Sequence, residues 1–179
     1  IEFFGCWDKF RTDKFKYSWN KSINSISWNH KFYDCYNINN IERINSFYFE
    51  KNYKEEEKIY NKVINSIGLK YIIICNDTTN TGQRSGGKEQ LMTNKYFINK
   101  DLPIFNLSRS SNKMLDLIKV IENAQEIHLS ESTWAIIVYI LKAKYNLFKN
   151  IPLFIHNYLR PRRNRKIFTN PSIKMKWIN

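Results

Sequence analysis

The segment from residue 102 to residue 143 constrains the fold most strongly, because it alternates between strand-like and helix-like patterns. Short apolar runs at 102–107 and 126–130 each precede a longer segment, 111–124 and 131–143, whose apolar residues recur at helical spacing. Parallel strands need a crossover connection, which is usually a helix. The order strand, helix, strand, helix therefore predicts a parallel α/β unit.

Two further apolar runs extend this unit toward both ends of the chain. Residues 71–75 read Tyr-Ile-Ile-Ile-Cys, a continuous apolar run typical of a strand buried on both faces of a parallel sheet. Residues 151–156 form another run of strand length, and residues 53–67 have an acidic front and helical spacing before Gly68, a natural helix stop. The sequence therefore predicts an open parallel sheet with helices on both faces. Its strands are expected near 71–75, 103–107, 126–130 and 151–156, and its helices near 53–67, 112–124 and 132–144.

The segments before this sheet carry weaker patterns. Residues 1–31 are rich in aromatic side chains and lysine without periodicity, and the chain begins with Ile1 rather than Met. We therefore expect residues 1–31 to be an irregular remnant of, or linker from, a preceding half, and residues 32–179 to form the α/β domain. Residues 43–50 alternate like a short strand, and the acidic triplet at 55–57 is expected to be a solvated first helical turn.

Charge and composition narrow the class of protein. The formal net charge of +13 favours anionic partners, meaning nucleic acid, nucleotide phosphates or an acidic membrane surface. Hydrophobic residues make up 42% of the chain, which suffices for a core and excludes global disorder. No run approaches the roughly 20 apolar residues of a membrane span, so none is expected. The three cysteines form no CxxC pair, so we expect neither a zinc site nor a disulfide framework, and a cytoplasmic location.

A long polar loop follows the first predicted strand. Residues 76–88 contain one acid, Asp77, one arginine, Arg84, and two adjacent glycines, at the strand end where ligands bind in open α/β sheets. The spacing of a P-loop is not met, because Lys88 is followed by Glu89 rather than by Ser or Thr. Either a binding site or a loop without a ligand role fits this composition.

The turn after the third predicted strand offers a second group of polar residues. Ser130 ends the strand, and Ser132 and Thr133 open the following helix. Both of the latter are N-cap candidates, and the amides and dipole of a helix N-terminus also hold anions such as a diphosphate. Capping and anion binding both remain open at this point.

A basic cluster follows the last predicted strand, which ends at His156. Residues 160–166 read Arg-Pro-Arg-Arg-Asn-Arg-Lys. Such a cluster can form a nucleic-acid patch, a solvated tail or, at Arg160, the edge of a phosphate pocket.

Several pieces of the chain occur in an order that resembles one family. They are Phe32-Tyr33, Arg43-x3-Phe47-Tyr48, the acidic helix, Tyr71-Ile-Ile-Ile-Cys-Asn-Asp77, Pro103-Ile-Phe-Asn-Leu107, Ile121-Glu-Asn-Ala-Gln-Glu-Ile-His-Leu-Ser130, Ser132-Thr133, Phe154-Ile-His156-x-Tyr158-x-Arg160 and Trp177. In this order they resemble the nucleotide-sugar-binding half of fucosyltransferase-like glycosyltransferases of the GT-B type, especially short microbial and viral members. The resemblance implies a Rossmann-like domain over residues 32–179.

The resemblance also implies a function and a set of site residues. The domain would bind a nucleotide-diphosphate sugar and transfer the sugar, of the fucose type, to a glycan acceptor. The implied substrate-binding residues are Arg84, Ser130, Ser132, Thr133, His156 and Arg160. Asp77 is the candidate base for the acceptor hydroxyl. No metal or other cofactor is required if arginine and backbone amides carry the charge of the diphosphate.

Two alternatives remain beside this interpretation. The first is a basic nucleic-acid-binding module that uses residues 160–166 for phosphate contacts and the aromatic residues of 1–31 for base stacking. The second is a catalytically silent fragment of a transferase that retains only the fold.

Overall fold

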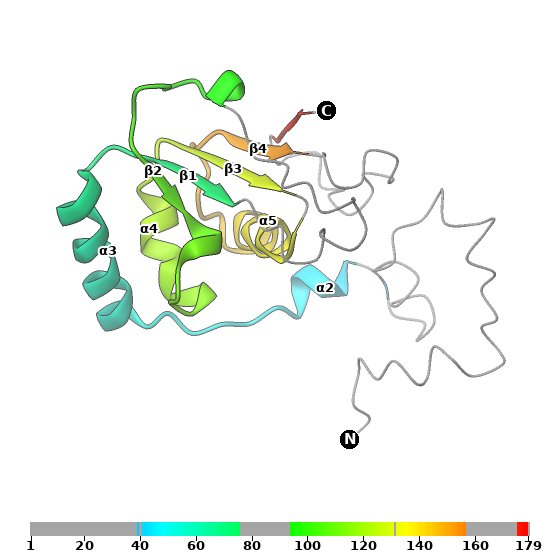
Figure 1. Ribbon diagram of the computed structural model, residues 1–179. Helices are drawn as coiled ribbons and strands as arrows, with labels where there is room; N and C mark the ends of the chain where they lie inside the picture. The colour runs from blue at the N-terminus through cyan, green and yellow to red at the C-terminus, as the bar shows by residue number, and fades with distance from the viewer. Residues whose placement is uncertain (1–38, 40, 76–93, 131, 157–174, 179) are drawn as a thin grey trace, which may run out of the picture.

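The computed structural model describes residues 39, 41–75, 94–130, 132–156 and 175–178 and shows a five-stranded, all-parallel sheet packed with helices (Figure 1). The strands are paired in the order β2-β1-β3-β4-β5. Their bounds are β1 Ile72–Cys75, β2 Ile104–Asn106, β3 Glu126–Ser130, β4 Leu153–His156 and β5 Lys176–Ile178. The predicted α/β class and parallel sheet are therefore confirmed, and β5 adds a strand that the sequence did not predict.

The chain changes direction across the sheet after β2, because β1 lies between β2 and β3. Ile73 of β1 is paired with Phe105 of β2 on one side and with Ile127 of β3 on the other. Parallel strands are joined by right-handed crossovers, so connections that run in opposite directions cover opposite faces. Figure 1 shows this arrangement: residues 94–103 lie above the sheet, whereas α4 (Ile118–Glu122) and α5 (Thr133–Tyr145) lie below it.

The helix before the sheet, α3 (Tyr53–Ile67), has the bounds that its sequence predicts. The side chain of Asn52 caps it by accepting a hydrogen bond from the Glu55 amide at 3.2 Å, and it ends at Gly68, whose φ of 89° suits glycine. The expectation of a solvated acidic turn is wrong for Glu56, which is only 2% exposed. The ammonium group of Lys51 lies 4.0 Å from the Glu56 carboxylate and forms an ion pair with it.

The helix predicted over 112–124 is shorter and less regular than expected. A 3-10 turn, Met114–Leu117, precedes α4, and Leu117 interrupts the α-helical path with φ −92° and ψ 2°. The apolar spacing nevertheless identifies the core residues, because Leu117, Ile118 and Ile121 are fully buried.

The strand predicted over 43–50 is wrong. A one-turn helix, α2 (Glu42–Asn45), occupies its beginning, and residues 47–50 form no strand. The alternation instead reflects packing against α5: the rings of Phe49 and Tyr145 meet edge to face at 5.0 Å. The carbonyl of Phe47 accepts hydrogen bonds from Lys144 and Tyr145, which replace the ladder partners of a strand.

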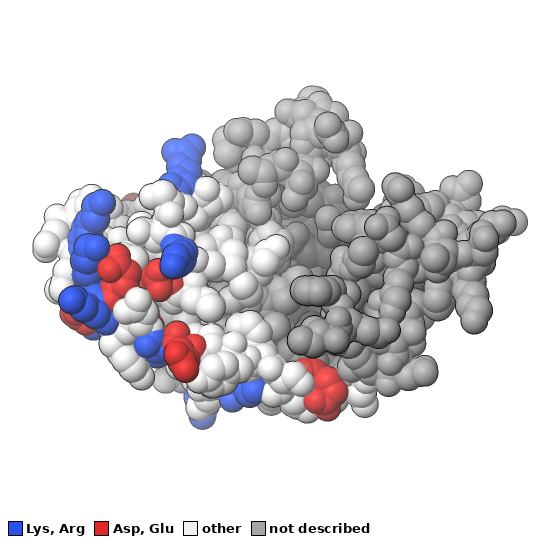
Figure 2. Space-filling view, turned by 90° about the horizontal axis from the view of Figure 1, so that it is seen from below, with Lys and Arg blue, Asp and Glu red and all other residues white. Residues whose placement is uncertain are grey.

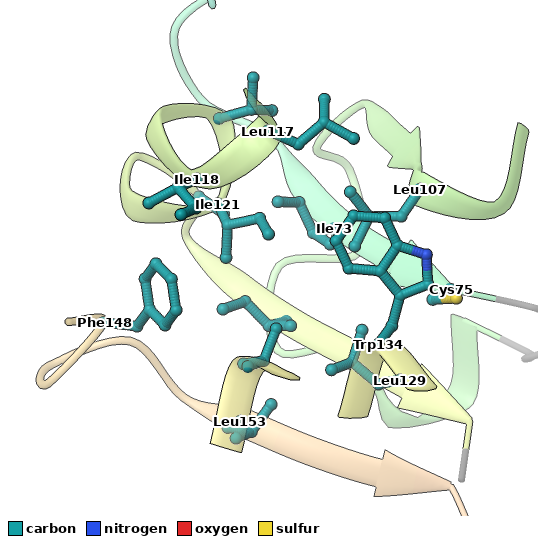
Figure 3. Packing of buried hydrophobic residues seen from close by; sticks show 14 of the residues in the cluster. Ile73, Cys75, Leu107, Leu117, Ile118, Ile121, Leu129, Trp134, Phe148 and Leu153 are labelled. Carbon is teal, nitrogen blue, oxygen red and sulfur yellow. The ribbon is translucent and has the colours of Figure 1, made fainter. Parts of the chain in front are cut away.

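The main core lies between the sheet and the helices. Alternate strand residues, among them Ile73, Cys75 and Leu129, pack with Leu117, Ile118 and Ile121, and Trp134 enters this cluster from the first turn of α5 (Figure 3). The other face of β1 packs with Phe97 instead of with a helix. Among the described residues, α3, α4 and α5 all contribute to one core, and the 94–103 segment covers the opposite face. Helices on both faces stay a prediction, because residues 76–93 of the β1–β2 connection lie outside the described residues.

No helix in the described ranges is both long and apolar enough to cross a membrane.

Candidate functional site

The strand order places a topological switch point at the carboxyl ends of β1 and β3. Cys75, the last residue of β1, is paired with Leu129 of β3, so the two strands end next to each other. The chain continues from β1 toward one edge of the sheet and from β3 toward the other edge. In open α/β sheets such a point is where ligands bind, because connections that leave in opposite directions open a crevice between them.

The turn from β3 into α5 lies at this point and contains two buried hydroxyl groups for which the described residues offer no hydrogen-bond partner. Ser132 is the N-cap residue of α5, and its carbonyl accepts the first helical hydrogen bond, from the Ile136 amide at 3.2 Å. Its side chain makes no capping bond, so of the two alternatives left open for Ser132 the capping one is not realised. Neither Ser132 Oγ nor Ser130 Oγ has a hydrogen-bond partner among the described residues, although both atoms are buried.

These two hydroxyls indicate a place prepared for a hydrogen-bonding ligand. A buried polar group without a partner costs about 1–3 kcal/mol, so proteins rarely leave one without a reason. Here Ser130, 7% exposed, and Ser132 lie within three residues of each other at the start of a 13-residue helix. The first turn of that helix carries no acid to offset the positive end of its dipole. The arrangement therefore suits an anionic ligand with several acceptor oxygens.

A buried chain of hydrogen bonds runs toward the same edge on the face of the sheet that residues 94–103 cover. His128 of β3 contacts Glu126 through Nε2 at 3.2 Å and His156 of β4 through Nδ1 at 2.9 Å. Glu126 also accepts hydrogen bonds at 2.9 Å from each of the amides of Ile98 and Asn99. Glu126, His128 and His156 are each 0% exposed, so the chain crosses the sheet face out of contact with water.

Aromatic rings enclose this chain and set its electrostatics. Phe154 stacks on His128 with ring centroids 4.4 Å apart, Phe97 lies at 4.6 Å from the same ring, and Tyr96 meets His156 edge to face at 5.8 Å. Burial, reinforced by the neighbouring His128, lowers the pKa of His156 to about 4. Burial lowers the pKa of His128 as well, and Glu126 opposes that shift. Both imidazoles are consequently neutral near pH 7.

The structure brings four of the predicted site residues together. Ser130 and His156 are register partners on neighbouring strands, and Ser132 and the exposed Thr133 follow within the same turn. The other three predicted site residues, Asp77, Arg84 and Arg160, lie outside the described residues, as do the segment 1–31 and the basic cluster 160–166.

Two residues of the site, Glu126 and His128, were missed by sequence reasoning. The sequence does contain a signal for them: Glu126, His128 and Ser130 occupy every second position of an otherwise apolar strand, so they share one face. Three polar residues on one face of a buried strand are expected to need partners on neighbouring segments. Within the described part of the chain, no group of three or more His, Cys, Asp or Glu side chains is arranged to hold a metal ion.

Comparison with protein-family models, with curated proteins and with solved structures finds no match to this chain. The strand order and the groups at the carboxyl edge are therefore what a proposal about function has to explain.

Proposed function

We propose that residues 32–179 form the nucleotide-sugar-binding half of a glycosyltransferase, a Rossmann-like domain of the GT-B type. The diphosphate of the donor lies against the turn 130–133, and the sugar, of the fucose type, is transferred to a glycan acceptor. The observation that carries this proposal is a pair of buried hydroxyls at the N-terminus of α5, Ser130 Oγ and Ser132 Oγ, which have no hydrogen-bond partner in the described part of the chain.

The chemistry of a diphosphate fits the groups at this turn. Its oxygens are acceptors, whereas a serine hydroxyl and the amides of a first helical turn are donors. The helix dipole adds an attraction for negative charge that a neutral ligand would not use. The turn also lies at the β1–β3 switch point, where a bound nucleotide reaches both strand ends.

Three residues outside the described ranges complete the proposal. Arg84, whose planar guanidinium suits paired phosphate oxygens, is expected to come from the loop after β1, and Arg160 from the segment after β4. Asp77, two residues beyond the end of β1, is the acid of that loop. Arginine and amides would carry the charge of the departing diphosphate, so the proposal needs no metal.

The helix-covered face of the molecule does not favour the nucleic-acid alternative. Figure 2 shows this face with basic and acidic side chains interspersed rather than gathered into a basic stripe. Lys51 pairs with Glu122 at 3.0 Å, and Lys119 pairs with Glu57. A surface that binds phosphate backbones needs lysines whose charge is available to the ligand. The face shown in Figure 2 therefore gives this alternative no specific support, and residues 160–166 and 1–31, on which the alternative rests, lie outside the described residues.

Isothermal titration calorimetry with GDP and UDP tests the proposal. We expect one of the two nucleotides to bind, and Ser130→Ala and Ser132→Ala each to weaken binding by about 0.5–1.5 kcal/mol, the contribution of a neutral hydrogen bond. Arg84→Ala is expected to cost about 1.5–3 kcal/mol, because it removes a charged donor. Ser66→Ala, which removes an exposed hydroxyl from α3, is the matched control. Absence of binding, or serine variants that bind as well as this control, would refute the proposal.

A further inference from the structure

A buried carboxylate fastens the 94–103 segment to the amino end of β3. The amides of Ile98 and Asn99 each donate at 2.9 Å to Glu126, the first residue of that strand. Glu126 is 0% exposed, and the side chain of Phe97 is buried on the same face of the sheet. The fold therefore fixes the backbone of this segment, including the two residues that precede Phe97.

From this anchor the segment runs, read backwards, to the carboxyl edge of the sheet. The ring of Phe97 lies 4.6 Å from that of His128, which is in the middle of β3. The ring of Tyr96 then meets that of His156, the last residue of β4, at 5.8 Å. Ser130, the last residue of β3, is the register partner of His156. The segment therefore lies against the direction of the strands and brings Tyr96 next to the edge where Ser130 lies (Figure 1).

Lys95 precedes Tyr96 and brings a positive charge to this edge. Its ammonium group lies 5.5 Å from the centroid of the Tyr96 ring, a cation–π contact. Lys95 is exposed, and no carboxylate of the described residues forms an ion pair with it. The exposed Lys100 also lacks an ion pair within the described ranges, so it is the position of Lys95 that distinguishes it.

The turn 130–133 needs a cation from another segment if it holds a diphosphate. It reads Ser-Glu-Ser-Thr, so it offers hydroxyls and amides but no positive side chain. Glu131 even adds an acid to this turn. Like charges a few ångströms apart repel each other, and a nearby ammonium group offsets that repulsion.

We propose that Lys95 is the cation that neutralises the diphosphate at the turn 130–133, and that Tyr96 is a positioning residue whose ring holds the ammonium group at this edge. The inference rests on the proposed function and deepens it, because it assigns a charged contact of the donor to the described part of the chain. A lysine ammonium group has three donors on a flexible stem, so it can move from the ring to the phosphate oxygens.

The competing explanation is that Lys95 is an ordinary solvated lysine. Two observations favour the binding role. The buried anchor at Glu126 holds the backbone beside Lys95, so its charge stays near the turn without a ligand. Lys100 lies on the far side of this anchor, toward the amino end of β3, and therefore serves as a matched control on the same segment.

Isothermal titration calorimetry of the full chain with GDP and UDP tests the role of the charge. For the nucleotide that the wild type binds, Lys95→Met is expected to weaken binding about 10-fold, because it removes a charge-assisted hydrogen bond. Lys95→Arg keeps the charge and is expected to stay within about 3-fold of the wild type, and Lys100→Met within about 2-fold. Salt screens an exposed contact, so the loss in Lys95→Met should fall below about 3-fold in about 0.5 M NaCl.

The same titration tests the positioning role of Tyr96. Tyr96→Leu removes the ring under the ammonium group and is expected to weaken nucleotide binding about 3-fold. Tyr96→Phe keeps the ring and should bind like the wild type. Equal losses in the two variants would overturn the positioning role, because the ring would then make no difference.

The outcomes separate this inference from the proposed function. If Lys95→Met binds the nucleotide as well as Lys100→Met, while the serine variants bind it more weakly, the role of Lys95 is overturned and the proposed function stands. A Lys95→Arg variant as weak as Lys95→Met would overturn it too, since the charge would not matter. Absence of nucleotide binding by the wild type would refute the proposed function, and the role of Lys95 with it.

Discussion

Acid is expected to destabilise this fold through its buried histidines, and His156 allows the size of the effect to be worked out. Its pKa is about 4 in the folded protein against an ordinary value of 6.5. Between these two values the unfolded chain binds a proton that the folded chain rejects, so acid favours unfolding. The contribution of His156 to stability is therefore fully present above pH 6.5 and is lost as the pH falls toward 4.

The size of this loss follows from the shift. At about 1.4 kcal/mol for each pH unit, a pKa lowered from 6.5 to about 4 corresponds to about 3 kcal/mol over the whole range, of which about 2.5 kcal/mol is lost by pH 4.5. His128 acts in the same direction, and Glu126 reduces its part by favouring the charged ring. The exposed Glu57, whose pKa is lowered by Lys119, also adds to acid sensitivity, so the histidine contribution has to be isolated by a variant.

Urea unfolding followed by tryptophan fluorescence between pH 4.5 and 7.5 measures the effect in the wild type and in His156→Phe. The variant has a constant offset, because His128 loses a hydrogen-bond partner at every pH. The informative quantity is the free energy of unfolding of the wild type minus that of His156→Phe. This difference is expected to fall by about 2.5 kcal/mol from pH 7.5 to pH 4.5, because only the wild type loses the His156 contribution. Parallel curves for the two proteins would show that His156 is not held neutral by burial and would refute the reasoning.

Two further predictions concern the helices. Lys142 is buried and donates through Nζ to three carbonyls of the turn 148–151, so we expect its role to be structural. Lys142→Met should cost about 2–4 kcal/mol in thermal unfolding, because it leaves these carbonyls without their donor. A loss below about 0.5 kcal/mol would contradict this role. Asn52→Ala should cost about 1 kcal/mol in urea unfolding through the lost cap. Ser132→Ala should not destabilise the fold and should raise its stability by up to about 1–3 kcal/mol, because Ser132 makes no capping bond and its buried hydroxyl has no partner among the described residues. Equal losses in these two N-cap variants would contradict the structure at Ser132.

The parts of the fold that the sequence predicts well depend on local patterns. The apolar run 71–75 is long enough for a strand and too short for most helices, and it forms β1. The helix 53–67 carries its own stop at Gly68, and its N-cap, Asn52, lies within the same segment. In both cases the residues that decide the structure lie next to one another in the chain.

The parts that the sequence predicts poorly depend on contacts made far along the chain. Residues 43–50 have the alternation of a strand, but their partners come from the end of α5: Lys144 and Tyr145 take the carbonyl of Phe47. Glu56 belongs to an acidic triplet that is expected to be solvated, yet it is buried near Lys51. No local pattern distinguishes residues 43–50 from a true strand, or Glu56 from a solvated glutamate.

The candidate site also has one part that local sequence predicts and one part that depends on long-range contacts. The turn 130–133 is predictable because a strand ends and a helix begins there, whatever the rest of the chain does. The contact between His128 and His156 joins residues 28 positions apart on strands whose pairing the sequence does not specify. Only the register, in which Ser130 faces His156 and His128 faces Phe154, brings the two imidazoles together.

The polar residues of β3 have fewer hydrogen-bond partners the closer they lie to the proposed site. At its amino end Glu126 is fully occupied, with two amides and an imidazole as donors. In its middle His128 uses both ring nitrogens. At its carboxyl end Ser130 is buried without a partner among the described residues. An apolar strand would avoid the cost of burying all three groups. Hydrogen bonds within the protein satisfy Glu126 and His128, so Ser130 is the residue whose partner we expect to be a ligand.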